Sequence, residues 1–272
     1  MKLGISVWAM PGNWDIATKF KKAKEAGFDG VEVALERGGD INFETTDAEL
    51  LDIKILAANC GIELYSVACG LGFEYPVGHC DESKREEGIE IIKRQLHIAR
   101  VLGCDTILTV PANITEESDY ETSYNNATEA LKALAPVAES FGVTIAVENV
   151  WNKFLMSPLE MRAFVDGVAS PFVQAYFDIG NVLNFGYPEQ WVKILGKRIK
   201  KVHIKDFEAA KGNLSGFNVR LCEGNVNFAA VIKALDEIGY DGWITAETPF
   251  DGSNPDKSNK YTCAAMKKII QM

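Results

Sequence analysis

Four side chains able to bind a metal ion or transfer a proton each follow a short apolar run. They are Glu148, Asp178, His203 and Glu247, and the runs end at residues 147, 177, 202 and 246. Such runs are typical of parallel strands buried on both faces, where a carboxylate is costly unless it is paired or bound to a metal. If these strands end at one edge, three carboxylates and one imidazole form a divalent-cation site. Oxygen-rich ligation favours Mn²⁺ or Mg²⁺ over a structural zinc site, and Zn²⁺ stays open as an alternative.

These runs belong to a pattern that repeats along the whole chain. Short runs rich in β-branched residues alternate with longer segments of helical period. The runs are 3–8, 31–33, 64–67, 106–110, 145–147, 173–177, 200–204 and 243–245, and the helical segments are 13–26, 47–60, 84–102, 124–141, 158–168, 188–195, 227–238 and 257–271. A glycine usually stands where a helix would end, as Gly103 and Gly142 do, and it suits a left-handed C-cap.

Eight strands that are each followed by a helix predict an α/β fold, a single (β/α)8 TIM barrel domain spanning residues 1–272. A doubly wound open sheet is less suitable, because no Gly-x-Gly-x-x-Gly follows any strand. Barrel active sites are built on the loops that follow the strands. The four polar residues and the two longest such loops, 68–83 and 205–226, are therefore expected at one rim.

Charge and cysteine content narrow the class of partner. The chain has 28 Lys and Arg against 38 Asp and Glu, a net charge of −10, which argues against nucleic acid or an anionic membrane surface as partner. No apolar run approaches the ~20 residues of a membrane span, and the first residues show no signal-peptide pattern. The six cysteines form no Cys-x-x-Cys, so we expect reduced thiols in a cytoplasmic enzyme with a small-molecule substrate. A homo-oligomer remains an open expectation.

The segments around the four polar residues resemble the xylose-isomerase-like barrel superfamily. They are Ala146-Val147-Glu148-Asn149, Phe177-Asp178-Ile179-Gly180-Asn181, Val202-His203-Ile204-Lys205-Asp206 and Thr245-Ala246-Glu247. Within the superfamily they look like the sugar-phosphate isomerase/epimerase family, which includes ketose 3-epimerases and L-ribulose-5-phosphate 3-epimerase. The resemblance implies that Glu148, Asp178, His203 and Glu247 bind one divalent metal. It also implies that Glu148 and Glu247 are the acid–base pair on opposite faces of the substrate carbon.

The chemistry of these residue types agrees with that implication. An enzyme that inverts or moves hydrogen beside a ketone must remove a proton from carbon and stabilise an enediolate. A metal supplies the Lewis acid, and a carboxylate on each side removes and returns the proton. Two bases on opposite faces give epimerisation, whereas one base working between two carbons gives aldose–ketose isomerisation. Which glutamate abstracts the proton depends on the configuration of the substrate.

Two positions depart from the free-ketose epimerases of this family. Those enzymes carry a His three residues after the metal Asp and a Glu six residues after the first metal Glu, where this chain has Asn181 and Phe154. The segment from His203 to Asp206 instead resembles the pentulose-phosphate branch. The sequence therefore leaves open whether the sugar is phosphorylated.

Five residues are predicted to contact substrate. Trp8 ends the first strand and is expected to stack on a sugar face, and Glu32 is expected to line the pocket. The resemblance implies that Asn181 handles substrate oxygens. Lys205 and Arg220 follow the seventh strand, where barrels commonly bind phosphate, and are expected to clamp a phosphate or carboxylate. Glu223-Gly224 resembles the family's Gly-x-Gly turn, with Cys222 in place of its first glycine.

The sequence therefore predicts a divalent-metal-dependent isomerase or epimerase acting on a sugar or sugar phosphate. One alternative is a lyase on the same scaffold, an inosose-type dehydratase or isomerase that shares the enolisation step. A non-catalytic sugar-binding barrel is another, against which the intact four-ligand set argues. The endonuclease branch of the superfamily needs many histidines, whereas this chain has three and a net charge of −10.

Overall fold

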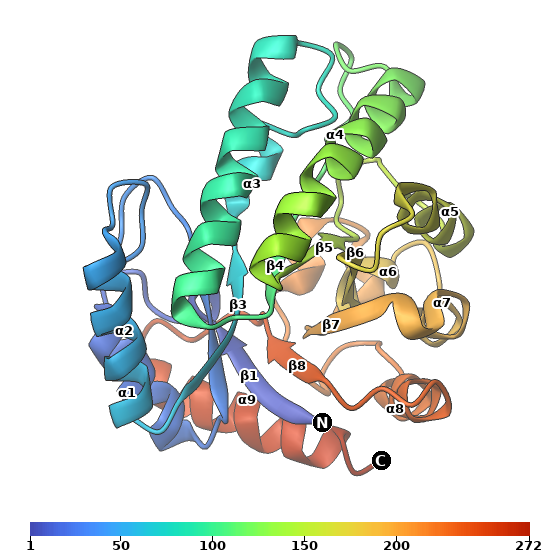
Figure 1. Ribbon diagram of the computed structural model, residues 1–272. Coiled ribbons are helices and arrows are strands. Elements are labelled where there is room, and N and C mark those ends of the chain that lie inside the picture. The colour runs from blue at the N-terminus through green and yellow to red at the C-terminus, as the bar shows by residue number, and fades with distance from the viewer. The chain divides into compact units, whose positions relative to one another are not determined.

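The computed structural model describes residues 1–272 and confirms the predicted (β/α)8 barrel (Figure 1). Its strands form a closed parallel sheet in sequence order, from β1 to β8. The strands are β1 (Lys2–Ser6), β2 (Gly30–Ala34), β3 (Glu63–Ala68), β4 (Thr106–Thr109), β5 (Thr144–Glu148), β6 (Val173–Asp178), β7 (Ile199–Ile204) and β8 (Trp243–Ala246).

Each predicted helical segment contains a helix. These helices are α1 (Ile16–Ala26), α2 (Asp47–Asn59), α3 (Glu82–Leu102), α4 (Tyr120–Phe141), α5 (Pro158–Val168), α7 (Pro188–Leu195), α8 (Phe228–Glu237) and α9 (Pro255–Ile269). The predicted C-cap glycines Gly103 and Gly142 have positive φ angles of 84° and 66°. A Cβ is disfavoured in this region, so these glycines end α3 and α4 without strain.

The chain divides into two compact parts, each with its own strand pairs. One part comprises Met1–Glu32, Asp52–Leu64 and Phe177–Met272. In it β8 pairs with both β7 and β1, and β1 pairs with β2. Helix α1 packs against α9, and α7 packs against α8. Ile204 of β7 lies opposite Ala246 of β8, so the chain leaves β8 at the same level as it leaves β7.

The other part comprises Val33–Leu51 and Tyr65–Tyr176, and contains the paired strands β3, β4 and β5. Helices α3 and α4 lie side by side (Figure 1). The buried side chain of Gln95 on α3 donates hydrogen bonds to the backbone oxygens of Val67 and Leu108, at 2.7 and 2.9 Å. A polar side chain under the sheet is thereby satisfied and fixes α3 to β3 and β4.

Three features differ from or add to the predicted elements. Strand β1 ends at Ser6 rather than residue 8, because the Ser6 hydroxyl accepts a hydrogen bond from the Trp8 backbone and starts the 3-10 turn Val7–Ala9. The short helix α6 (Ile179–Val182) follows β6 directly. The loops after β3 and β7 contain further 3-10 turns, at Gly70–Phe73, Ala209–Lys211 and Leu214–Phe217.

All six cysteines are free thiols, as the sequence predicts. No helix combines the length and apolar character needed to cross a membrane.

Candidate metal centre

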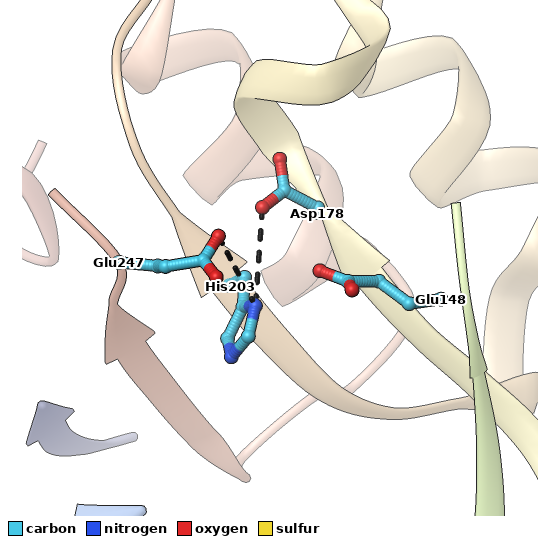
Figure 2. Close-up of side chains that lie close together, drawn as sticks. All are labelled: Glu148, Asp178, His203 and Glu247. Carbon is cyan, nitrogen blue, oxygen red and sulfur yellow. Dashed lines mark ion pairs between the residues drawn. The ribbon is translucent and has the colours of Figure 1, made fainter. Parts of the chain in front are cut away.

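Four side chains from the ends of β5, β6, β7 and β8 point toward one another (Figure 2). They are Glu148, Asp178, His203 and Glu247, the set predicted from the sequence. Each offers one ligand atom, and these atoms all lie within 4.8 Å of one another. Glu148, Asp178 and His203 are buried, whereas 23% of the Glu247 side chain is exposed. The set therefore has one partly open side at Glu247.

The two carboxylate oxygens of Asp178 have different partners. Oδ1 caps the short helix α6 by accepting a hydrogen bond of 2.7 Å from the Asn181 backbone. Oδ2 faces the cluster, 3.9 Å from His203 Nδ1 and 3.1 Å from Lys205 Nζ. Because Oδ1 is held by the backbone, the orientation of Oδ2 toward the cluster is fixed by the fold of α6.

The imidazole of His203 is held from its far side by Glu32. Its Nε2 lies 2.8 Å from Glu32 Oε1, and both side chains are fully buried. With Nε2 donating to this carboxylate, Nδ1 is the ring nitrogen that faces the cluster. It lies 3.8 Å from Glu247 Oε2. A carboxylate behind a histidine is the usual arrangement that orients a metal-binding imidazole and raises its basicity.

Lys205 is a cation in direct contact with two carboxylates of this cluster. Its ammonium forms ion pairs with Glu247 Oε2 and Asp178 Oδ2. Burial would raise the pKa of Glu247, but the charge of Lys205 and the neighbouring imidazole of His203 outweigh it and lower that pKa below its ordinary value. Burial raises the pKa of Asp178, and Lys205 offsets only part of this effect. Glu247 is therefore ionised at neutral pH and available to accept a proton.

The donor set fits a divalent ion. Metal–ligand distances of about 2.0–2.2 Å place ligands on opposite sides of an ion about 4.4 Å apart. The observed separations of up to 4.8 Å need only small side-chain rotations to reach this value. Three carboxylates and one imidazole suit Mn²⁺, Mg²⁺ or Zn²⁺. The residues could thus hold one ion, with Glu247 at the side from which a substrate can approach.

The loop after β7 is organised by Asp206, the residue after Lys205. Asp206 is 1% exposed, and its Oδ1 accepts hydrogen bonds from the backbones of Phe207 and Val226 at 2.8 and 3.1 Å. Its Oδ2 accepts a third from the Gly224 backbone at 2.9 Å. A Cβ on Gly224 would lie 2.3 Å from Asp206 Oδ1, so only glycine permits this approach. One carboxylate thereby closes a loop of about twenty residues onto the end of β7.

The residues predicted to contact substrate have different surroundings. Trp8 is half-buried in the turn after β1, and Asn181 is 5% exposed in α6, one turn after Asp178. Glu32 is fully buried, and its partner is His203. The structure brings Glu32, Asn181 and Lys205 to the ligand side chains. Their roles toward substrate stay predictions.

Arg220 lies in a different set of contacts from Lys205. Its side chain is 61% exposed, with Nε 3.5 Å from Glu223 Oε2 and the guanidinium 5.2 Å from the centre of the Tyr261 ring. It lines a cavity of about 410 Å³ between the loops after β7 and β8. Lys257 and Ser258, in the first turn of α9, line the same cavity.

Three residues carried no prediction of a role: Asp206 and Gly180 beside the centre, and Lys257 at the cavity of Arg220. The signal for Asp206 was its position two residues after the end of β7, where a buried carboxylate needs backbone donors. Gly180 lies in a segment that carries the family resemblance and Lys257 in a predicted helix, but their contacts with Lys205 and with the Arg220 cavity join positions distant in sequence.

Comparisons with known proteins agree with this architecture. Residues 20–269 match the family described as xylose isomerase-like TIM barrel. The L-ribulose-5-phosphate 3-epimerase UlaE of Salmonella heidelberg is 25% identical over 257 residues, which cover 91% of this chain and 89% of that protein. Among solved structures, a D-psicose 3-epimerase crystallised with D-fructose has a TM-score of 0.84 at 20% identity and full coverage of both chains. An L-ribulose 3-epimerase has the same TM-score at 18% identity, covering 99% of this chain and 94% of that one.

Proposed function

Because the chain belongs to the xylose isomerase-like TIM barrel family, we propose that it is a divalent-metal-dependent isomerase or epimerase of a ketose or ketose phosphate. The observation that carries the proposal is the convergence of Glu148, Asp178, His203 and Glu247 within 4.8 Å. The names of the relatives support the same reaction class, since both solved structures and the sequence relative are 3-epimerases of ketoses or ketose phosphates. Mn²⁺ is the ion that we propose.

The four ligands would hold the ion, which would supply a Lewis acid for the carbonyl and neighbouring hydroxyl oxygens of the sugar. Glu247 accepts the proton from carbon in this scheme, because its lowered pKa keeps it ionised and its side chain is partly exposed. Glu148 returns the proton from the opposite face, and a substrate of the opposite configuration exchanges these two roles. Glu32 keeps His203 in one tautomer throughout the cycle.

The cavity beside Arg220 supports a phosphorylated substrate. Arg220 and Lys257 bring two positive charges to it, and the positive end of the α9 helix dipole lies at the same cavity. Asp251 lines the same cavity and removes part of this charge. The loops after β7 and β8 are also where barrels commonly bind phosphate. We therefore propose that Arg220, rather than Lys205, contacts the phosphate of the sugar.

The test is NMR in D₂O of the Mn²⁺-loaded protein with a panel of ketoses, their 5-phosphates and inosose. We expect deuterium at a carbon beside the carbonyl of one substrate, together with its epimer or isomer. The Glu148→Gln and Glu247→Gln variants should lower exchange by at least about a hundredfold, since each removes one proton carrier. Glu208→Gln, at a glutamate of the loop after β7 whose side chain is 46% exposed, is the control and should exchange at the wild-type rate.

Other outcomes of this experiment identify other functions. A dehydrated product from inosose would show a lyase, and binding of a sugar without deuterium exchange would show a binding protein. Unchanged exchange in both glutamate variants would contradict the assignment of the acid–base pair. For a ketose phosphate, Arg220→Ala should raise KM by about tenfold with little change in kcat, because a remote phosphate contact acts mainly on binding.

A further inference from the structure

Lys205 contacts the same oxygen atoms that would bind the metal. Its ammonium lies 3.1 Å from Asp178 Oδ2 and forms an ion pair with Glu247 Oε2. These two oxygens also face His203 Nδ1, at 3.9 and 3.8 Å. Lys205 is only 13% exposed, so solvent screens its charge little. A positive charge tethered to the chain therefore shares two of the proposed ligand atoms.

The fold holds Lys205 at this position from two sides. A Cβ on Gly180 would lie 2.5 Å from Lys205 Cγ and 2.9 Å from the Lys205 backbone oxygen. Gly180 does not have a positive φ, so the backbone conformation does not require a glycine at this position. Glycine is needed because the Lys205 side chain occupies the space that a Cβ would fill. On another side, the Lys205 ammonium lies 5.2 Å from the centre of the Phe217 ring, within the range of a cation–π contact. Lys205 is thus a built part of the site and not a surface cation.

The charges of the site explain what such a lysine does. Glu148, Asp178 and Glu247 bring three negative charges, whereas a divalent ion brings two positive charges. Glu32 lies on the Nε2 side of His203, away from the ligand atoms. Counted together with Lys205, the three ligand carboxylates have a formal charge of −2, equal in magnitude to the charge of a divalent ion. Without it the charge would be −3, which suits a trivalent ion better.

We propose that Lys205 matches the charge of the centre to a divalent ion, and that it weakens metal binding in proportion to the charge of the ion. This inference rests on the proposed function, because it takes the four ligands as a metal site. Lys205 acts through Asp178 and Glu247 and is a positioning residue of the centre. Its part in the site differs from the phosphate clamp that the sequence suggests for it.

The experiment compares the affinities of wild type and Lys205→Met for Mn²⁺, by electron paramagnetic resonance, and for Tb³⁺, by luminescence. Methionine keeps much of the length and apolar character of the lysine stem but removes the charge. We expect Mn²⁺ to bind roughly tenfold more tightly to the variant. Since Coulomb energy scales with charge, Tb³⁺ should then bind about thirtyfold more tightly. Lys205→Arg keeps the charge and should restore affinities close to those of wild type.

Lys211→Met is the matched control, because Lys211 belongs to the same loop, is 51% exposed and contacts only Glu208 among the ion pairs. It should leave both affinities unchanged. If Lys205→Met loosened the site in general, both ions would bind more weakly to the variant than to wild type. If the lysine charge had no effect, wild type and variant would bind both ions with equal affinity. Either result overturns the inference. A different result would contradict the proposed function: in that case the wild-type protein itself would bind neither Mn²⁺ nor Tb³⁺.

Discussion

The loops after β5 and β7 both follow proposed metal ligands, but they are held in different ways. The loop at residues 149–157 contains two non-glycine residues with positive φ, Lys153 at 58° and Leu155 at 51°. Phe154 between them is 2% exposed and packs on Tyr120, with ring centres 5.5 Å apart. The loop at 205–227 also contains an aromatic pair, Phe207 and Phe217, whose ring centres lie 4.8 Å apart. Its two ends, however, are joined by the three backbone hydrogen bonds that Asp206 accepts.

The two loops at the rim of the barrel are stabilised by different interactions. Apolar packing spreads the stabilisation of the β5 loop over several rings, including Tyr124 and Phe164, which lie 6.1 and 5.6 Å from Phe154. In the β7 loop a single carboxylate satisfies donors from both ends of the loop. Substitutions that reduce buried side-chain volume should therefore destabilise the β5 loop most. Loss of the Asp206 carboxylate, a hydrogen-bond acceptor, should destabilise the β7 loop most.

The largest effect is expected from Phe154→Ala. Removing a fully buried ring leaves a cavity among Tyr120, Tyr124 and Phe164, and should lower the free energy of unfolding by about 4 kcal/mol. Chemical denaturation measures this loss. Phe154→Leu, which refills much of the volume, should lose clearly less. If both variants lost the same free energy of unfolding, the buried volume of the side chain would not be what stabilises this loop.

Asp206→Ala should have the next largest effect, a loss of about 3 kcal/mol. Three backbone N–H groups, those of Phe207, Gly224 and Val226, would lose a charged acceptor. The comparison is Ser157→Ala, which removes one helix-cap hydrogen bond, to Glu160, at the end of the β5 loop and should lose about 1 kcal/mol. A loss for Asp206→Ala no greater than that for Ser157→Ala would contradict the anchoring role of Asp206.

Glycine substitutions at non-glycine residues with positive φ should separate the stability effect of backbone strain from that of side-chain burial. Cys222 has a φ of 70° and is exposed, so Cys222→Gly should raise stability by about 0.5 kcal/mol through relief of strain. Leu155 has a similar φ but is 3% exposed. Leu155→Gly should therefore lose about 2 kcal/mol, because the buried side chain outweighs the strain. Thermal unfolding of both variants checks the opposite signs.

The smallest effect concerns pH at the start of α4, whose Tyr120 donates to Glu160 and packs on the β5 loop. Hydrogen bonds from the Thr122 side chain and backbone lower the pKa of Asp119 below 3.8. The ionised Asp119 carboxylate therefore stabilises the folded protein at pH values above 3.8. This stabilisation is lost as the pH falls through the lowered pKa of the folded state. Between about pH 5 and pH 2.5, Tm should fall less in Asp119→Asn than in wild type. A parallel fall in both proteins would show that this cap does not contribute.

The barrel and the four ligand residues could be predicted from the sequence, because both follow from local patterns. Alternation of apolar runs with helical periods marks strands and helices, and a polar residue directly after a buried strand marks the rim. The family resemblance predicted the same set. All eight strands and eight helices are present at the predicted places.

Other parts of the site depend on contacts that no local pattern reveals. Glu32 and His203 are 171 positions apart, so their hydrogen bond could not be read from either segment. The position of Lys205 depends on space left by Gly180 and on the ring of Phe217, both outside its own segment. The cavity at Arg220 includes Lys257, which lies in the first turn of α9, and helical periodicity does not show that this residue meets the loop after β7. That the chain is a single domain, and the roles of the individual site residues, stay predictions.

The most direct test of the metal centre is Mn²⁺ stoichiometry and affinity, measured by calorimetry on wild type, His203→Ala and Glu32→Gln. We expect about one ion per chain for wild type and no measurable binding for His203→Ala, which loses a ligand. Glu32→Gln should bind about 10- to 100-fold more weakly, since Glu32 only orients the imidazole. If wild type binds neither Mn²⁺ nor Zn²⁺, or if His203→Ala binds as tightly as wild type, the four residues do not form a metal centre.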